Sequence, residues 1–155
     1  MKDVTNPDYW RDRMYGAFAS GERHRLMFNG SKDAFDAREA TQREAIKVIG
    51  ARQSVIDVGC GYGRLLELLR LQGWQGRYVG YDVSPDLVEI ARRWWPDHQF
   101  YVRDIVKNPP PCSIRSHWAV AMWVRTMLID NQMPETWEWI ERWMRTVADN
   151  LLVVD

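Results

Sequence analysis

A glycine-rich turn holds the residues of this sequence that are best suited to binding a ligand. The mostly apolar segment 55–58 is followed by Gly59, Gly61 and Gly63, and a leucine-rich segment then begins at Arg64. Glycine lets a backbone turn sharply and approach a ligand with no side chain between them. In a doubly wound sheet such a turn lies at the carboxyl edge of the strands, where ligands bind. A tight strand-to-helix turn without a ligand is the alternative interpretation.

The spacing of the glycines distinguishes two classes of ligand. Dinucleotide-binding domains use the pattern G-x-G-x-x-G. Here the pattern is G-x-G-x-G, and Arg64 stands where the last glycine of a dinucleotide-binding turn is expected. Asp57 lies two positions before Gly59, inside the predicted strand. A carboxylate in a buried strand is costly unless something pairs with it, so Asp57 needs a partner.

Two more acids follow predicted strands. Asp82 ends the second strand, and Asp104 comes just after the third, directly before Ile105. A carboxylate at Asp82 can accept hydrogen bonds from both hydroxyls of a ribose, which also fits a nicotinamide cofactor. The structural alternative for Asp82 is an acid near a helix N-cap at Ser84. The alternative for Asp104 is an ordinary loop acid, because aspartate is common in turns.

The turn and the three acids resemble motif I and the later signatures of the class I S-adenosylmethionine-dependent methyltransferases, over residues 52–155. The resemblance implies that the methionine ammonium of the cofactor pairs with Asp57, near the glycines, and that Asp82 holds the ribose. Asp104 and Ile105 would contact the adenine. The cofactor is then S-adenosyl-L-methionine and its product S-adenosyl-L-homocysteine. The residues that the resemblance assigns to the cofactor are Asp57, Gly59, Cys60, Gly61, Gly63, Asp82, Val83, Asp104, Ile105 and Met122.

Alternating strand and helix patterns must position these residues. Strands are predicted at 54–58, 77–82, 99–102, 118–124 and 151–154. Helices are predicted near 7–19, from Ser31 to Gly50, and over 64–72, 85–95 and 134–147. Strands that alternate with helices indicate an α/β fold whose parallel sheet is covered on both faces.

The resemblance refines this expectation to a three-layer Rossmann-like methyltransferase fold with five strands in the order 3-2-1-4-5. Members of the family continue beyond the fifth strand with an antiparallel hairpin, whereas this sequence stops at Asp155. We therefore expect either a fragment or a minimal enzyme. Residues 1–155 are expected to form a single methyltransferase-like domain, with a helical preface at 1–50 and a cofactor-binding core at 51–155.

The composition argues against several classes of protein. Basic and acidic residues number 21 each, so the net charge is zero and gives no strong nucleic-acid signal. No stretch reaches the roughly 18–20 apolar residues that span a bilayer, so no membrane association is expected. Cys60 and Cys112 are too few for a disulfide framework or a four-cysteine metal site, which favours the cytoplasm. His98 and His117 lack ligand-spaced partners, so no metal site is predicted.

Methyl transfer in this family needs little chemistry from the protein, so the catalytic residue is unknown from the sequence. The sulfonium is a good leaving group, and catalysis consists mainly of approach, orientation and exclusion of water. The resemblance places the acceptor site in Met122–Asp130, beyond the fourth strand. Enzymes that methylate bases or glutamine carry an Asn/Asp-Pro-Pro-aromatic loop there, and this sequence does not. The acceptor is unidentified, with a small molecule slightly favoured.

Several other residues have two interpretations. Arg125 could hold an anionic acceptor or pair with Asp130. His24, between two arginines, could act as a base near the site or lie in a solvated loop. The segment Asn108–Pro111 is interpreted as a stiff connector. Three aromatic residues could line the acceptor pocket or close the cofactor cleft: Tyr9, Trp10 and Tyr15.

Two rival functions use the same residues. A non-catalytic S-adenosylmethionine-binding module that supports a partner subunit would explain the missing hairpin. A nicotinamide-dependent oxidoreductase is disfavoured by the glycine spacing and the chain length. The apolar segment Leu151–Val154 carries no charge or proline, so its outer edge is an association hazard. Together with Trp139 and Trp143, it is expected to be covered by a second copy in a homodimer, by the N-terminal helices or by a partner.

Overall fold

The computed structural model describes residues 4–20 and 32–155. Its helices are α1 (Pro7–Ser20), α2 (Lys32–Ala45), the 3-10 helix η2 (Ile46–Val48), α3 (Arg64–Leu71), α4 (Pro85–Trp94), α5 (Val124–Asp130) and α6 (Pro134–Val147). Its strands are β1 (Val55–Val58), β2 (Tyr78–Asp82), β3 (Gln99–Val102), β4 (Ser116–Met122) and β5 (Ala148–Val154). The predicted strand-and-helix alternation is present from β1 onward.

The strands form one parallel sheet of five, in the order β3-β2-β1-β4-β5. β1 is central, so Val58 is paired with Tyr81 of β2 on one side and with Ala121 of β4 on the other. Because all strands run the same way, their carboxyl ends meet at one edge. This topology confirms the predicted Rossmann-like fold class and strand order.

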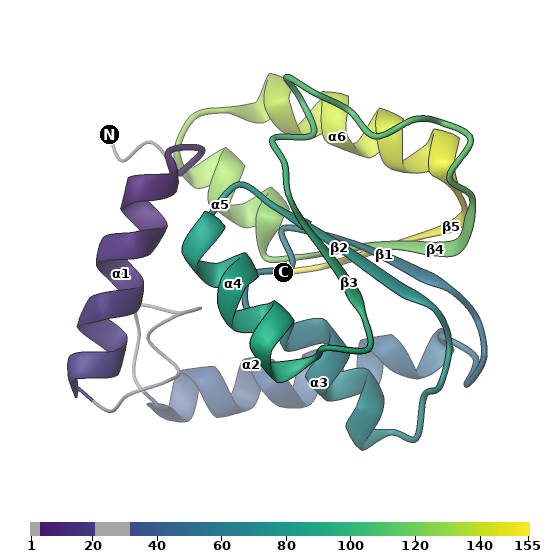
Figure 1. The fold of residues 1–155 in the computed structure, drawn as a ribbon, viewed down its shortest axis with the longest axis horizontal. Helices are drawn as coiled ribbons and strands as arrows, with labels where there is room; N and C mark the ends of the chain where they lie inside the picture. Colours follow the sequence, from purple (N-terminus) through teal and green to yellow (C-terminus); the bar gives the residue numbers. More distant parts are fainter. Residues whose placement is uncertain (1–3, 21–31) are drawn as a thin grey trace.

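Helices cover both faces of the sheet (Figure 1). On one face α3, α4 and η2 pack on a core that includes Ile46 and Leu65. On the other face α5 and α6 pack on a core that includes Leu128 and Met144. Every residue of β1 and β2 is buried, because a central parallel strand with helices on both sides has no face left for solvent.

Arg64, the residue that departs from the dinucleotide-binding pattern, joins two helices. It lies at the start of α3 and is 7% exposed. Its Nη1 pairs with Glu67 Oε2 at 2.6 Å, and its Nη2 pairs with Glu39 of α2. Its guanidinium carbon also lies 5.5 Å from the ring centre of Phe35. A glycine at this place would remove the anchor that ties α2 to the helix after the glycine turn.

The end of β4 differs from the prediction. The strand stops at Met122 rather than at residue 124, because Trp123 adopts a φ of 63°. That left-handed conformation interrupts the extended chain and starts α5, a helix that the sequence pattern did not predict. The Trp123 N–H still donates to the carbonyl of Val154 at 2.7 Å, so the bend is fixed against the neighbouring strand.

The start of β5 also differs from the prediction. The strand begins directly after α6, three residues earlier than expected. The polar residues Asp149 and Asn150 concealed this part of the strand in the sequence. Asp149 pairs with Arg115 at 2.7 Å, and Asn150 Nδ2 donates to the carbonyl of His117 at 3.0 Å. These polar contacts with Arg115 and with β4 replace the apolar packing that is typical of a buried strand.

The N-terminal helix packs against α4, where Met14 and Ala17 form a small core with Leu87. The connector around His24 lies outside the described residues, and so does Ser31, the predicted start of the second helix. Within residues 4–20 and 32–155, no helix has the length and apolar character needed to cross a membrane.

Candidate functional site

A cleft opens at the carboxyl edge of the sheet, beside the ends of β1, β2, β3 and β4. It holds about 120 Å³ of free space. Most of the residues predicted to hold a cofactor line it, namely Gly59, Gly61, Asp82, Val83, Asp104, Ile105 and Met122. Far apart in the sequence, they come together because parallel strands end at the same edge.

The glycine turn between β1 and α3 adopts backbone angles that other residues avoid. Gly59, Gly61 and Gly63 have φ values of 71°, 52° and 88°, in the left-handed region that only glycine occupies without penalty. A Cβ at Gly59 would lie 2.5 Å from Val124 Cγ2, and one at Gly63 would lie 2.8 Å from Trp95 Cδ1. Both the backbone and the neighbouring side chains therefore require glycine at these two positions.

The amides of the glycine turn have partners within the protein. Gly59 and Cys60 both donate to the carbonyl of Tyr81, at 2.8 and 3.1 Å. Gly61 donates to Oδ2 of Asp82 at 2.8 Å. The turn is thus attached to the end of β2 by backbone and side-chain acceptors.

Asp82 connects the glycine turn with the start of α4. Its Oδ2 accepts from Gly61 N, and its Oδ1 accepts from Ser84 N at 2.8 Å. Burial raises the pKa of Asp82, while these backbone donors act in the opposite direction. Each carboxylate oxygen has a second lone pair, so Asp82 can also accept hydrogen bonds from a ligand in the cleft.

Asp104 shapes the turn after β3. Its Oδ1 accepts from the backbone of Val106 at 3.0 Å and of Lys107 at 3.2 Å, which is the local pattern that makes aspartate frequent in turns. Its Oδ2 lies 3.3 Å from Lys107 Nζ. The next residue, Ile105, is 6% exposed and presents an apolar surface beside the carboxylate.

Asp57 lies beneath the glycine turn and does not line the cleft. It points to the side of the sheet covered by α3, where the hydroxyl of Tyr78 donates to its Oδ2. Burial raises the pKa of Asp57 to about 8; the Tyr78 hydrogen bond opposes that shift and nearby Asp82 adds to it. The partner that the sequence required for Asp57 is therefore present within the protein.

Cys60 and Gly63, two other predicted residues, also lie away from the cleft lining. The Cys60 side chain packs against Gly80, where a Cβ would lie 2.8 Å from Cys60 Sγ. Burial, with a contribution from the Asp82 charge, raises the pKa of the Cys60 thiol well above its usual value. A neutral buried thiol is a poor nucleophile, so Cys60 acts as a small spacer.

The N-terminal segment supplies part of the cleft wall. Val4, Thr5 and Trp10 line the cleft, and Trp10 Nε1 donates to the carbonyl of Val4 at 2.8 Å. Tyr9 packs edge-on against Trp10, with ring centres 4.9 Å apart. Tyr15 is 60% exposed and lies on the outside of α1. Of the three aromatic candidates, only Trp10 lines this cleft.

The remaining wall follows β4 and is mainly apolar. It lies within or near the predicted acceptor region 122–130, and its residues on α5 and α6 are Val124, Met127, Leu128, Thr136 and Ile140. Thr136 and Ile140 were not predicted to line the cleft, because they reach it through the packing of α6 on α5. Arg103 is the one basic residue among the described residues of the lining.

Arg125 does not line the cleft, and its predicted partner was wrong. Its Nε donates to Oδ2 of Asp155 at 2.5 Å rather than to Asp130. Oδ1 of Asp155 accepts from the Thr126 backbone at 3.2 Å. The last residue of the sequence therefore fixes the first turn of α5.

The connector Asn108–Pro111 contains no helix or strand, as expected. It covers part of α6, because Trp143 Nε1 donates to the carbonyl of Pro110 at 3.4 Å and Trp143 is 6% exposed. No pattern in the sequence indicated that this connector covers Trp143. In the described residues, no group of three or more His, Cys, Asp or Glu side chains is placed to hold a metal. The predicted basic cluster around His24 lies outside them.

Comparisons with known proteins give this chain relatives of one kind. The family model described as "Methyltransferase domain" matches residues 18–146. The trans-aconitate 2-methyltransferase of Rhodopseudomonas palustris strain BisB18 is 40% identical over 57 residues, which cover 37% of this chain and 22% of that protein. The enzyme of the same name from strain BisB5 is 31% identical over 93 residues, covering 57% and 36%. The chain thus spans well under two thirds of the length of these curated relatives.

Solved structures with a similar fold carry the same kind of name. The magnesium protoporphyrin IX methyltransferase of Synechocystis PCC 6803, determined with bound SAM, matches 97% of this chain and 77% of its own. The TM-score is 0.59 and the identity is 19%. At this identity the likeness establishes a shared fold.

Proposed function

This chain belongs to the methyltransferase domain family, and we propose that it transfers the methyl group of S-adenosyl-L-methionine to a small organic acceptor. The observation that carries the proposal is the convergence of the glycine turn, Asp82 and the Asp104–Ile105 pair on one cleft. The structural relative with bound SAM supports the choice of cofactor.

The residues of the cleft fit this cofactor. Asp82 retains lone pairs for the ribose hydroxyls, because each of its oxygens accepts one backbone N–H. Asp104 would accept from the adenine amino group, with Ile105 packed against the ring. The turn at Gly59 and Gly61 carries no side chain, so its backbone would approach the methionine end closely. Asp57 does not line the cleft, so it would support the turn from beneath, and its contact with the cofactor ammonium stays a prediction.

When bound, the cofactor supplies a methyl group that leaves its sulfonium for a nucleophilic atom of the acceptor. The residues of the chain would orient the acceptor and exclude water, which are the main sources of acceleration for such a transfer. Val124, Met127 and Ile140 present apolar surface for this purpose. Thr5 and Thr136 also line the cleft.

A small molecule is the acceptor class that we favour. The two curated relatives described above are named for trans-aconitate, a small organic acid. In this chain, however, Arg103 is the one basic residue among the described residues lining the cleft. This wall is therefore better matched to an acceptor with a largely apolar body than to one with several carboxylates, because each buried carboxylate needs a cationic or hydrogen-bonded partner.

Calorimetric titration with S-adenosylhomocysteine and with NAD tests the proposal. We expect saturable binding of S-adenosylhomocysteine and none of NAD. Incubation with methyl-labelled cofactor and fractionated small-molecule extracts should then label a low-mass product. A folded protein that fails to bind S-adenosylhomocysteine would refute the proposal. Binding with no labelled product in any fraction would instead favour a non-catalytic module that works with a partner subunit.

We also propose that a second copy of the chain covers the outer edge of β5. β5 is the last strand in the sheet order, and no strand of the described residues pairs with its outer edge. Leu151, Leu152 and Val153 are half-buried there, and an open apolar edge promotes association. Sedimentation at micromolar concentration should give the mass of two chains, whereas a soluble monomer would contradict the homodimer.

A cytoplasmic location is proposed as well, since Cys60 and Cys112 are both unpaired.

A further inference from the structure

A second hollow lies on the sheet face beneath the connector between β3 and β4. Residues at alternate positions of a strand share a face, so Arg77 and Tyr81 lie on the same face as Tyr101 and Arg103. Val79 and Gln99 lie between them, while Pro110, Pro111 and Ile114 close the hollow from the connector. The hollow, which we call the tyrosine groove, holds about 220 Å³ of free space. α6 covers the neighbouring strands on this face (Figure 1).

The floor of the tyrosine groove is aromatic. Tyr81 and Tyr101 are paired across β2 and β3, and their rings stack with centres 5.7 Å apart and planes at 24°. Trp143 meets Tyr81 edge-on from the side of α6, at 6.2 Å. Tyr101 is 41% exposed, so one face of this stack is open to a ligand. The Tyr81 hydroxyl has no hydrogen-bond partner among the described residues, although its ring is buried.

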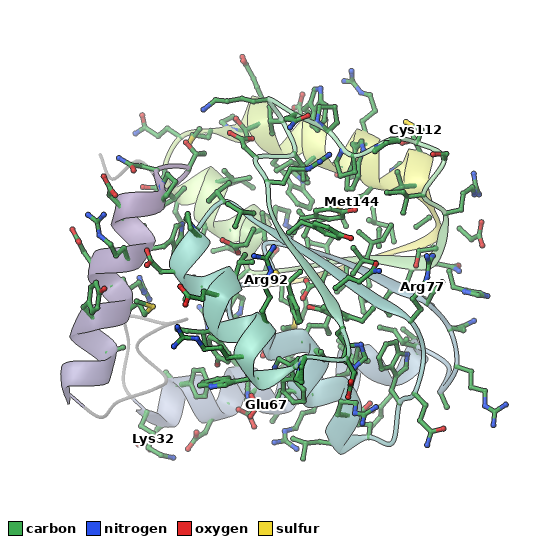
Figure 2. All side chains as sticks on the ribbon, in the orientation of Figure 1. Lys32, Glu67, Arg77, Arg92, Cys112 and Met144 are labelled. Atoms are coloured by element: carbon green, nitrogen blue, oxygen red, sulfur yellow. The ribbon has the colours of Figure 1, made fainter. Side chains whose placement is uncertain are left out.

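The charge around this floor is positive and unbalanced. Arg77 and Arg103 form no ion pair with any acid in residues 4–20 and 32–155, and Arg77 donates only to the carbonyl of Arg115 at 3.0 Å. Burial raises the pKa of Tyr81, and both arginines act against that rise. Tyr101 is the other charged or titratable group that acts on it, and no acid does. Figure 2 shows Arg77 at the end of the sheet farthest from α1.

We propose that the tyrosine groove binds a small organic anion with a flat ring, which stacks on Tyr101 and whose carboxylate or phosphate group is attracted by the positive charges of Arg77 and Arg103 at the two ends of the groove. Guanidinium groups bind such anions with strong charge-assisted hydrogen bonds. Aromatic side chains provide the stacking surface for a flat ring. The small, partly closed hollow and the zero net charge of the chain favour a single small ligand over a nucleic-acid strand.

The groove shares two residues with the cofactor cleft, because Tyr81 and Arg103 line both. For this reason the test uses Arg77 and Tyr101, which do not line the cleft. Phenyl phosphate and benzoate serve as the anionic probes, and benzyl alcohol is the neutral probe of similar shape. Each probe is titrated into the full chain by calorimetry, with and without saturating S-adenosylhomocysteine. Binding of the probe and binding of S-adenosylhomocysteine are thus measured separately, so the absence of one is distinguished from the absence of the other.

We expect saturable binding of at least one anionic probe, about tenfold tighter than benzyl alcohol. Arg77→Gln and Tyr101→Ala should each weaken that binding about tenfold and leave the affinity for S-adenosylhomocysteine unchanged. Arg93→Gln is the matched control, because Arg93 is exposed on α4 and pairs with Glu89. If the first variants fold poorly, two conservative variants replace them: Arg77→Lys keeps the positive charge, and Tyr101→Phe keeps the aromatic ring. Tyr101→Phe should bind the anionic probe like the wild type.

Preference for phosphate over carboxylate, or the reverse, would identify the anionic group. No saturable binding of either anion would overturn the proposal, as would equal binding of benzyl alcohol or of the Arg77→Gln variant. Binding of a single-stranded oligonucleotide that depends on Arg77, without binding of phenyl phosphate or benzoate, would also overturn it and assign the groove to nucleic acid.

Discussion

The two walls of the cleft are held in place by different forces. At the ends of β2 and β3, Asp82 and Asp104 accept backbone hydrogen bonds that fix each turn in one geometry. The wall formed by α5, α6 and the N-terminal segment is mainly apolar, with Val124 and Met127 among its residues. Directional bonds specify a ligand atom by atom, whereas apolar packing specifies size and shape. The first wall therefore suits the proposed cofactor, and the second suits the proposed acceptor.

The largest effect is expected where the two walls touch. In Gly59→Ala the new Cβ would overlap Val124 Cγ2, and the residue would keep a φ of 71°. Strain and overlap together should lower the free energy of unfolding by about 2–4 kcal/mol, measured by urea titration. Gly73→Ala is the matched control, because its φ is 80° and nothing lies within 4 Å of the added Cβ. Gly73→Ala should lower the free energy of unfolding by only about 1 kcal/mol. Equal losses for the two variants would show that the added Cβ at residue 59 does not clash with Val124.

Removing the acid of the polar wall should give the next largest effect. Asp82→Ala should weaken S-adenosylhomocysteine binding about 10- to 100-fold, because a carboxylate that accepts charge-assisted hydrogen bonds is lost. Calorimetry measures the affinity, and circular dichroism checks the fold. Asp97→Ala, an exposed acid beyond α4, should bind normally. If the folded Asp82→Ala protein binds as tightly as the wild type, the polar wall does not hold the ribose.

The raised pKa of Asp57 predicts how the stability of the protein depends on pH. This pKa is raised to about 8 in the fold, against about 3.9 in an unfolded chain. Between these values the folded protein keeps a proton that the unfolded chain has lost. Stability from this group is therefore full below about pH 4 and falls as pH rises towards 8, by up to about 1.4 kcal/mol per pH unit.

Asp57→Asn removes this titration and should make the stability of the variant less dependent on pH. Urea titrations at pH 5, 6 and 7 measure the slope, with Asp97→Asn as the control. Identical slopes for wild type and Asp57→Asn would contradict a buried, protonated carboxyl. If Asp57 also meets the cofactor ammonium, the bound cation should lower its pKa. Cofactor binding near pH 7 should then release a proton, which appears as a buffer-dependent heat in calorimetry.

The smallest effect is expected on the apolar wall. Met127→Ala removes part of one apolar surface, so the acceptor kcat/KM should fall by about threefold. The affinity for S-adenosylhomocysteine should stay within about twofold, because no polar contact changes. Ile129→Ala, an exposed apolar residue on the same helix, is the control. A larger loss of cofactor binding than of acceptor turnover would show that the two walls do not divide their roles in this way.

The sequence predicted those features of the site that depend on neighbouring residues in the chain, and not those that depend on contacts between distant residues. The glycine turn was predictable because positive φ values at Gly59 and Gly63 restrict the residue type. The fold class followed from the alternation of strands and helices. The partnership of Asp57 with Tyr78 was not predictable, because it joins two strands through a side-chain hydrogen bond. The left-handed bend at Trp123 had no local signal either, and α5 was missed with it.

The N-terminal part of the cleft could not be predicted for a similar reason. Val4 and Thr5 line the cleft beside residues of β2 and β4 that are far from them in the sequence, so only the tertiary fold brings them together. Their polar and apolar pattern is too short to indicate an element. The Arg125–Asp155 pair likewise depends on β5 ending beside the start of α5.

The attachment of the glycine turn to β2 has a consequence for the kinetics of binding. Gly59, Cys60 and Gly61 already donate their N–H groups to Tyr81 and Asp82, so the turn is held in shape by the protein itself. A ligand that fits this shape need not order the loop, and the entropy cost of association is correspondingly small. Association should therefore be a single fast step whose rate rises linearly with ligand concentration, without the plateau that a slow rearrangement of the turn would impose.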